Sequence, residues 1–141
     1  FSYEQLFQTM RKLGLTYPEA EQLFRRMVFN VVARNCDDHT KNFSFRLKQN
    51  DQWELAPAYD ICHSYRPDSD WVSQHALSIN GKRKAILKKD VLNVAEAMNI
   101  KKAGHIIDEI NEVVNQWKVY AKNVGVYPKL TQAIEKTLLK L

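Results

Sequence analysis

The spacing of hydrophobic residues changes twice along this chain, and the changes restrict the fold to helices with a small β insertion. Before residue 35, apolar residues recur three and four positions apart, which is the period of one helix face. Between residues 43 and 55 they alternate with polar residues, which is the period of a strand. From residue 91 the helical spacing returns. We therefore expect a mainly α protein with a small β-hairpin insertion.

Capping signals mark two N-terminal helices. Ser2 and Gln5 form a capping box, and Gly14 stands where a left-handed residue would end the helix. Thr16 and Glu19 form the same box for a second helix, which runs up to Asn35. The apolar stripe of that helix consists of Leu23, Phe24, Met27, Val28, Val31 and Val32. Such a stripe is far more often core than a partner groove, so we assign it to the core.

Two short apolar runs separated by turn residues predict the β-hairpin. The runs span residues 43–47 and 53–55, and the turn lies at residues 49–51. Downstream, the alternating run from His75 to Ile79 precedes an Asn80-Gly81 turn, so a small third strand or ribbon is expected.

The C-terminal part is predicted to be helical. Asp90 is expected to cap one helix, and Pro128 is expected to open the last one. Between them, the apolar residues from Ile106 to Trp117 indicate one long amphipathic helix.

Composition fits a single domain over residues 1–141. A chain of this length with 45% hydrophobic residues can bury a core but is short for two domains. It has no apolar stretch that could cross a bilayer and no export signal, so a cytoplasmic location is expected. Cys36 and Cys62 are then expected to be free thiols. The first residue is Phe1 rather than Met, which indicates part of a longer product or a processed form.

Polar residues are concentrated in the segment NCDDHTKNFSF, Asn35 to Phe45, which is followed by WELAPAYD, Trp53 to Asp60. Phosphoryl transfer needs a carboxylate to accept the proton of the attacking hydroxyl, and oxygen ligands for Mg²⁺. Protein kinases supply these with a catalytic Asp, an Asn five residues later and a second Asp after a β-hairpin. Asp37 and Asn42 have this spacing, and Asp60 follows the predicted hairpin. The pattern indicates a Mg²⁺-dependent kinase site.

The same two segments resemble the signature of the HipA family of bacterial toxin kinases, which act on serine or threonine. The catalytic loop of that family reads Asp-x-His-x-Lys-Asn and its metal-binding Asp closes a Pro-x-Tyr-Asp stretch, as residues 37–42 and 57–60 do here. The Ser-Tyr-Glu opening, the Leu-Ser-Ile segment and the helical tail also resemble the family, so the resemblance covers essentially all 141 residues. It implies a kinase-like C-terminal lobe of the HipA type.

The resemblance also implies roles for individual residues. Asp37 is the expected general base toward a substrate serine, and Asn42 and Asp60 are the expected Mg²⁺ ligands. The residues expected to line the phosphates of ATP are His39, Thr40, Lys41, Asn42, Tyr59 and Asp60.

Three side chains of the loop allow more than one interpretation. Lys41 is expected to contact phosphate, and the alternative is that it only balances the charge of two aspartates. His39 could hydrogen-bond either the ligand or the loop backbone. Asp38 lacks the five-residue spacing to Asn42, so we assign it to the surface or to loop capping.

Several elements of a complete kinase have no counterpart in the sequence. There is no glycine-rich phosphate loop, no Val-Ala-x-Lys strand and no helix glutamate to pair with such a lysine. The resemblance therefore implies an N-terminal kinase lobe as partner. It further implies a protein substrate, with aminoacyl-tRNA synthetases as the targets in the family, and arrest of translation. A helix-turn-helix antitoxin of the HipB type is also implied, and DNA contact is expected through that antitoxin.

Two functions without catalysis stay open at this point. Cys36, His39, Cys62 and His63 could supply four ligands for a tetrahedral Zn²⁺, although the second pair is adjacent in sequence. The net charge of +5 and the basic run from Lys82 to Lys89 permit a nucleic-acid-binding module, although such a run is usually solvated surface.

Overall fold

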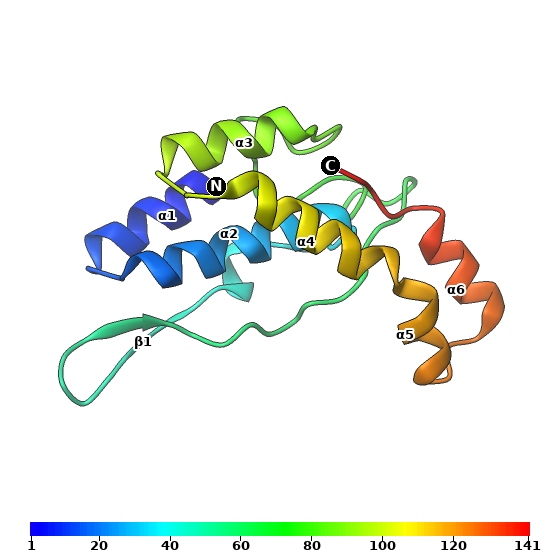
Figure 1. The fold of residues 1–141 in the computed structure, drawn as a ribbon, viewed down its shortest axis with the longest axis horizontal. Helices are drawn as coiled ribbons and strands as arrows, with labels where there is room; N and C mark the ends of the chain where they lie inside the picture. Colours follow the sequence, from blue (N-terminus) through cyan, green and yellow to red (C-terminus); the bar gives the residue numbers. More distant parts are fainter.

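Helix α2 (Tyr17–Val32) lies at the centre of the fold, because it packs against α1 (Tyr3–Lys12) on one side and α4 (Ala103–Asn115) on the other. The computed structural model describes all 141 residues. The other helices are α3 (Lys88–Ala97), α5 (Trp117–Asn123) and α6 (Pro128–Glu135), with one 3₁₀ turn, η1 (Thr40–Asn42). Figure 1 shows α5 and α6 together at one end of the molecule, and the β-hairpin reaching away from the helices at the other.

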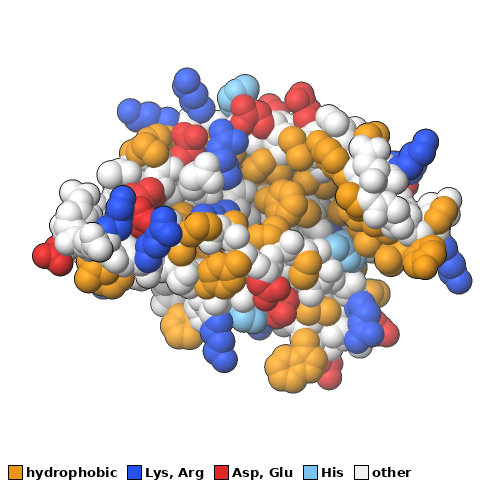
Figure 2. Space-filling view, turned by 90° about the horizontal axis from the view of Figure 1, so that it is seen from below, with side chains coloured by type: hydrophobic (Ala, Val, Ile, Leu, Met, Phe, Trp, Pro, Cys, Tyr) orange, Lys and Arg blue, Asp and Glu red, His pale blue; other side chains and the backbone are white.

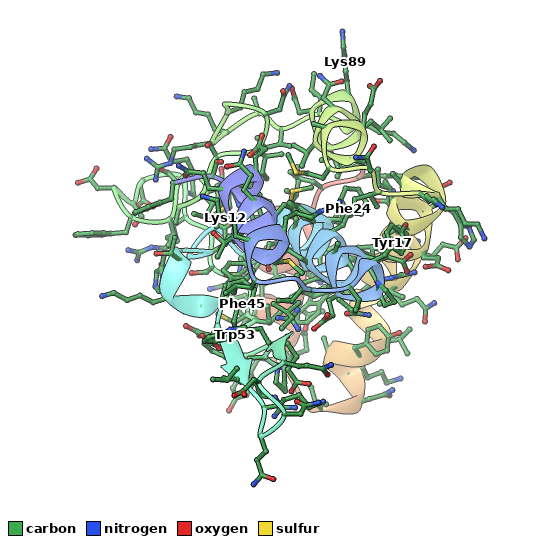
Figure 3. The ribbon with its side chains drawn as sticks, turned by 90° about the vertical axis from the view of Figure 1, so that its left-hand side faces the viewer. Lys12, Tyr17, Phe24, Phe45, Trp53 and Lys89 are labelled. Carbon is green, nitrogen blue, oxygen red and sulfur yellow. The ribbon has the colours of Figure 1, made fainter.

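The apolar stripe of α2 is core, as predicted. One continuous cluster of 23 buried residues extends from Tyr3 to Val114 and includes the stripe. Phe24 lies in the middle of the helices, whereas Lys89 projects away from them (Figure 3). The ring of Phe43 packs edge-on against Tyr3, with 5.7 Å between the ring centroids, and this contact joins the polar loop to the core.

Both predicted capping boxes are confirmed. Ser2 Oγ accepts from the backbone N–H of Gln5 at 3.2 Å, and Gln5 Oε1 accepts from the N–H of Ser2 at 2.9 Å. Gly14 has the predicted positive φ of 73° after α1. Helix α2 ends at Val32, slightly before the predicted limit, because Arg34 adopts a φ of 60° and the chain leaves the helical path there.

The hairpin is also confirmed. Strands β1 (Phe45–Leu47) and β2 (Trp53–Leu55) pair antiparallel, with Phe45 opposite Leu55. The predicted third strand is wrong: Ser78 makes only a single-residue bridge to Ser2, and Ile79 makes one to Lys82. The segment finds no longer partner because the chain beside it enters α1 at Tyr3, whose N–H donates to the Ser78 carbonyl at 3.0 Å.

The helix predicted from Ile106 to Trp117 is confirmed as α4 except at its end, because Trp117 begins the next helix. Helix α4 ends at Asn115 and α5 begins at Trp117, after a turn at Gln116. The indole N–H of Trp117 donates to the Thr131 carbonyl at 3.0 Å, which fastens α5 to α6 rather than continuing the line of α4. Pro128 opens α6 as predicted. None of these helices is both long enough and apolar enough to cross a membrane.

Asp90 stabilises the start of α3 from inside the helix rather than as its N-cap. The helix begins at Lys88, and Asp90 Oδ2 accepts from the N–H of Leu87 at 3.0 Å. The Nζ of Lys82 lies 2.8 Å from Asp90 Oδ1, and Asn80 Nδ2 donates to the same oxygen at 3.0 Å. The ion pair with Lys82, together with these donors, outweighs burial and lowers the pKa of Asp90 to about 2.

This lowered pKa predicts a loss of stability in acid. Because the pKa of Asp90 in the folded state lies below its unfolded value, the stabilisation is present above about pH 5 and is lost as the pH falls toward 2. With Lys82 half-exposed and screened, we expect Asp90→Asn to lower the free energy of unfolding by about 1 to 2 kcal/mol at pH 7. Urea denaturation of both proteins across this pH range should show the difference shrinking toward zero near pH 2.

The matched control is Asp108→Asn, because Asp108 pairs with Lys88 at 3.3 Å but is exposed. That change should alter the free energy of unfolding by less than about 0.5 kcal/mol at every pH. Equal effects of the two substitutions would contradict the account of Asp90.

Candidate functional site

The polar loop after α2 is held by backbone hydrogen bonds to two later segments. The N–H of Cys36 donates to the Ser64 carbonyl at 3.0 Å, and the Cys36 carbonyl accepts from the N–H of Ala76 at 3.1 Å. Ser64 in turn donates its N–H to the carbonyl of Arg34 at 3.0 Å. The loop is therefore fixed on both sides by chain that follows the hairpin.

Asp38 is buried, so its assignment to the surface or to loop capping is wrong. Asp38 Oδ2 accepts from the Tyr3 hydroxyl at 2.7 Å and lies 2.9 Å from Nδ1 of His75. Its Oδ1 accepts from the N–H of Ala76 at 2.8 Å. These three donors, from segments far apart in sequence, make burial of the carboxylate possible. A carboxylate enclosed in this way cannot reach a substrate.

Asp37 has the opposite environment. Its carboxylate is half-exposed, and its nearest charged neighbour is Nε2 of His39 at 3.8 Å. The side-chain amide of Asn42 donates to the backbone carbonyl of Asp37 at 2.9 Å. This bond uses the nitrogen of the Asn42 amide and leaves its oxygen available. Asp37 and Asn42 are therefore brought together, as their spacing predicted.

Asp60 returns to the loop along a path anchored to α2. Glu19 Oε1 accepts from the N–H of Leu55, and Arg26 donates to the Ala56 carbonyl, at 2.9 and 2.8 Å. The hydroxyl of Tyr59 then donates to the carbonyl of Lys41 at 2.9 Å, which links the segment after the hairpin directly to η1. Figure 1 shows this segment running back beneath α2.

Next to Asp60, burial first and then the charges of Asp60 and Asp37 raise the pKa of the Cys62 thiol. Asp60 itself has a φ of 53°, a left-handed conformation that Asp tolerates better than most residues. Its side chain is exposed and has no hydrogen-bond or ion-pair partner in the protein.

The loop and the returning segment offer donor types that Mg²⁺ prefers, namely the carboxylate of Asp60 and the amide oxygen of Asn42. Neither oxygen donor is engaged by a cation of the protein. Lys41 is exposed and forms no ion pair with Asp37 or Asp38.

The other predicted site residues lie around this set. Thr40 begins η1 and lines a hollow of about 330 Å³ beside α1. The His39 ring makes no hydrogen bond to the loop backbone, and its Nδ1 is buried without a partner. Figure 2 shows the face that carries the hairpin, with acidic and histidine side chains among hydrophobic ones and most Lys and Arg at the periphery.

Sequence reasoning missed the buried polar residues behind the loop. These are Tyr3, Asn30, Asn35 and His75, which are all at most 1% exposed. One signal was available: Asn30 stands between Met27 and Val31 inside the apolar part of α2, where a polar residue needs a partner.

The structure contradicts the zinc hypothesis. No group of three or more His, Cys, Asp and Glu side chains is close enough to hold a metal ion. Cys36 is moreover fully buried, which raises the pKa of its thiol to about 11. His63 is instead bonded to Thr137 Oγ1 at 2.7 Å, and both cysteines are free, as expected.

The basic run from Lys82 to Lys89 is largely engaged within the protein. Lys82 pairs with Asp90, Lys88 pairs with Asp108, and Arg83 Nε donates to the His75 carbonyl at 2.6 Å. A nucleic-acid interface requires cations that are free to meet phosphates, so this observation weakens that hypothesis. A cavity of about 600 Å³ lies among α4, α6 and the C-terminal tail, and none of the candidate site residues lines it.

Comparison with known proteins gives a consistent result. The family model described as "HipA-like C-terminal domain" matches residues 1–117, which include the polar loop and Asp60. A protein of Sinorhizobium fredii named "Putative kinase Y4dM" is 29% identical over 132 residues, a match that covers 89% of this chain and 32% of the relative. The chain thus spans about a third of the length of that relative. No solved structure matches the chain significantly.

Because Asp38 is buried and Asp37 is half-exposed, replacing Asp38 should destabilise the protein much more than replacing Asp37. Asp38→Ala leaves the Tyr3 hydroxyl and the His75 ring without this acceptor, and leaves the N–H of Ala76 with only its longer bond to the Cys36 carbonyl, so we expect a loss of about 3 kcal/mol or more. Asp37→Ala should change the free energy of unfolding by less than about 0.5 kcal/mol. Urea denaturation followed by tryptophan fluorescence measures both. Similar losses for the two neighbours would show that the burial of Asp38 is not what distinguishes them.

Proposed function

The chain belongs to the family of HipA-like C-terminal domains, and from this we propose that it is the catalytic C-terminal lobe of a protein serine/threonine kinase. The single observation that supports the proposal best is the meeting of Asp37, Asn42 and the Asp60 segment at one loop. Asn42 is bonded to Asp37, and Tyr59, the neighbour of Asp60, is bonded to Lys41. This is the set of oxygens that phosphoryl transfer requires.

In the proposed reaction, Asp37 orients the hydroxyl of a substrate serine and accepts its proton. The serine oxygen forms a bond to the γ-phosphorus of ATP, the bond from that phosphorus to the β,γ-bridging oxygen breaks, and ADP leaves. Asp37 suits this role because its carboxylate is half-exposed and is not engaged by a strong donor. Asp38 does not, because it is buried.

Asn42 and Asp60 are the proposed Mg²⁺ ligands. Bound Mg²⁺ would neutralise phosphate charge between carboxylates that otherwise repel the nucleotide. Asn42 can offer its oxygen because its nitrogen is held by the Asp37 carbonyl, and Asp60 can offer a carboxylate that has no partner in the protein. Lys41, exposed and unpaired, is the proposed phosphate cation, and His39, Thr40 and Tyr59 are the remaining proposed phosphate-lining residues.

An N-terminal lobe, in the same protein or as a separate chain, is the proposed partner. The sequence has no glycine-rich loop or β-strand lysine of the kind that covers ATP in kinases. The candidate residues lie on an exposed surface, which suits one side of a cleft between two lobes.

The finer parts of the proposal come from family resemblance. The proposed substrate is a serine of a protein, with an aminoacyl-tRNA synthetase as first candidate and translation arrest as the consequence. A helix-turn-helix antitoxin of the HipB type is the proposed regulatory partner, with DNA bound through it, and the proposed location is the cytoplasm. Incubation of the two-lobed kinase with purified synthetases and labelled ATP tests the substrate directly.

Nucleotide binding by the chain alone should be weak and dependent on Mg²⁺. Because only the phosphate end of ATP would be gripped, on a surface open to water, we expect a Kd above about 0.1 mM. Asn42→Ala and Asp60→Ala should each weaken this binding, and the double variant should lose little more than the worse single one, since both ligands serve one ion. Titration followed by NMR, with and without Mg²⁺, measures these effects. Additive losses, or binding indifferent to Mg²⁺, would count against a shared metal site.

Phosphotransfer should depend on Asp37 once the N-terminal lobe is supplied. Asp37→Ala should lower the rate by about 100-fold or more while nucleotide binding stays within a few-fold. Asp108→Ala, an exposed aspartate of α4, is the matched control and should keep full activity. A rate assay with labelled ATP decides it, and a fully active Asp37→Ala enzyme would remove Asp37 from the proposed mechanism.

A further inference from the structure

A chain of buried hydrogen bonds connects the polar loop to the backbone of Asp60 through the body of the protein. Asp38 accepts from the Tyr3 hydroxyl at 2.7 Å, and that hydroxyl accepts from Nδ2 of Asn30 at 2.9 Å. Oδ1 of Asn30 accepts from Nδ2 of Asn35 at 3.1 Å. The same Asn35 nitrogen lies 3.5 Å from the carbonyl oxygen of Asp60.

The donor and the acceptor are fixed in the hydrogen bonds that connect Asp38, Tyr3 and Asn30. A tyrosine hydroxyl has one hydrogen, and here Asp38 receives it, so the oxygen is left to accept from Asn30. Burial, and then the charge of Asp38, raise the pKa of Tyr3 well above its ordinary value, which keeps that hydrogen in place. The Asn30 amide is then fixed, with its nitrogen toward Tyr3 and its oxygen toward Asn35.

These hydrogen bonds fix the positions of the side chains more than they stabilise the fold. Oδ1 of Asn35 is buried without any partner, an unfavourable state that follows from turning the amide nitrogen toward Asn30 and Asp60. A phenylalanine at position 3 would keep the edge-on contact with Phe43 and would require none of these polar partners. Buried polar chains of this kind fix one geometry where apolar packing permits several.

We propose that the Tyr3 hydroxyl is a positioning group that couples the loop carrying Asp37 and Asn42 to the segment carrying Asp60. The proposal rests on the function proposed above. Tyr3 touches neither nucleotide nor metal. It acts through Asp38, whose backbone continues into Asp37, and through Asn30 and Asn35 toward Asp60.

The hydrogen-bond network adds to other bonds between the two segments. The hydroxyl of Tyr59 donates to the Lys41 carbonyl at the surface, and Ser64 forms backbone bonds with Arg34 and Cys36. These bonds hold residues on either side of Asp60, whereas the Asn35 amide is directed at the carbonyl of Asp60 itself. Metal and phosphate sites lose affinity and rate when their ligands move by as little as about 1 Å.

The test uses Tyr3→Phe in the full 141-residue chain, which removes one oxygen atom. Hydrogen exchange measured by NMR should show amides of residues 36–42 and 60–64 exchanging about 10-fold faster than in the unmodified protein. The matched control is Tyr17→Phe, because the Tyr17 hydroxyl accepts from the N–H of Lys101 at 2.9 Å in another part of the fold. That variant should leave exchange in both segments unchanged.

A second readout is the Mg²⁺-dependent ATP affinity, measured by NMR titration well below the melting temperature. Tyr3→Phe and Asn35→Ala should each weaken it by about 5-fold to 10-fold, and the double variant should be no weaker than the worse single one. A purely structural role would lower the melting temperature but would leave the affinity of the folded molecules unchanged.

The outcomes separate this proposal from the proposed function. If Tyr3→Phe lowers the melting temperature but exchange at residues 60–64 or the ATP affinity stays unchanged, Tyr3 is structural only and the proposal is overturned. If the unmodified chain shows no Mg²⁺-dependent ATP binding at any concentration, the proposed function fails. The exchange experiment then still decides whether Tyr3 couples the two segments.

Discussion

The buried carboxylate of Asp38 is the interaction on which the rest of the structure depends. Moving an ionised carboxylate out of water is unfavourable by several kcal/mol unless donors surround it. Here the donors come from Tyr3 at the start of α1 and from His75 and Ala76 after the hairpin. The requirement to satisfy one charge thus joins three parts of the chain at a single carboxylate, in addition to the backbone bonds of Tyr3 with Ser78 and of Cys36 with Ala76. The polar loop is where they meet.

The two neighbouring aspartates lie in different environments, Asp38 inside the protein and Asp37 half-exposed. The bonds of Asp38 fix the loop backbone, and they thereby limit the positions open to the carboxylate of Asp37. The Asn42 amide reinforces this by bonding to the Asp37 carbonyl rather than to its side chain. Structural and chemical demands are divided between two adjacent residues.

Local signals predicted much of the fold, and long-range partners decided the rest. The boxes at Ser2 and Thr16, the hairpin, and the spacing of Asp37 and Asn42 each depend on residues close in sequence, and the structure has them all. The burial of Asp38 depends on Tyr3, 35 positions earlier, and on His75, 37 positions later, so no local pattern reveals it. The division between α4 and α5 likewise coincides with a bond from Trp117 to a residue of α6.

The hairpin shows how Asp60, the proposed metal ligand that is distant in sequence, returns toward the polar loop. Bringing Asp60 back to the polar loop closes a loop in the backbone, which carries an entropic cost. If the segment between them were unstructured, Asp60 could also occupy many positions. Strand pairing shortens the free path, and Glu19 and Arg26 then fasten the chain after the hairpin to α2. Both anchors lie on the helix whose end leads into the polar loop. One rigid element therefore sets both the origin of the loop that carries Asp37 and Asn42 and the return of the segment that carries Asp60, and this is how a short chain can direct the proposed base and the two proposed metal ligands to one surface.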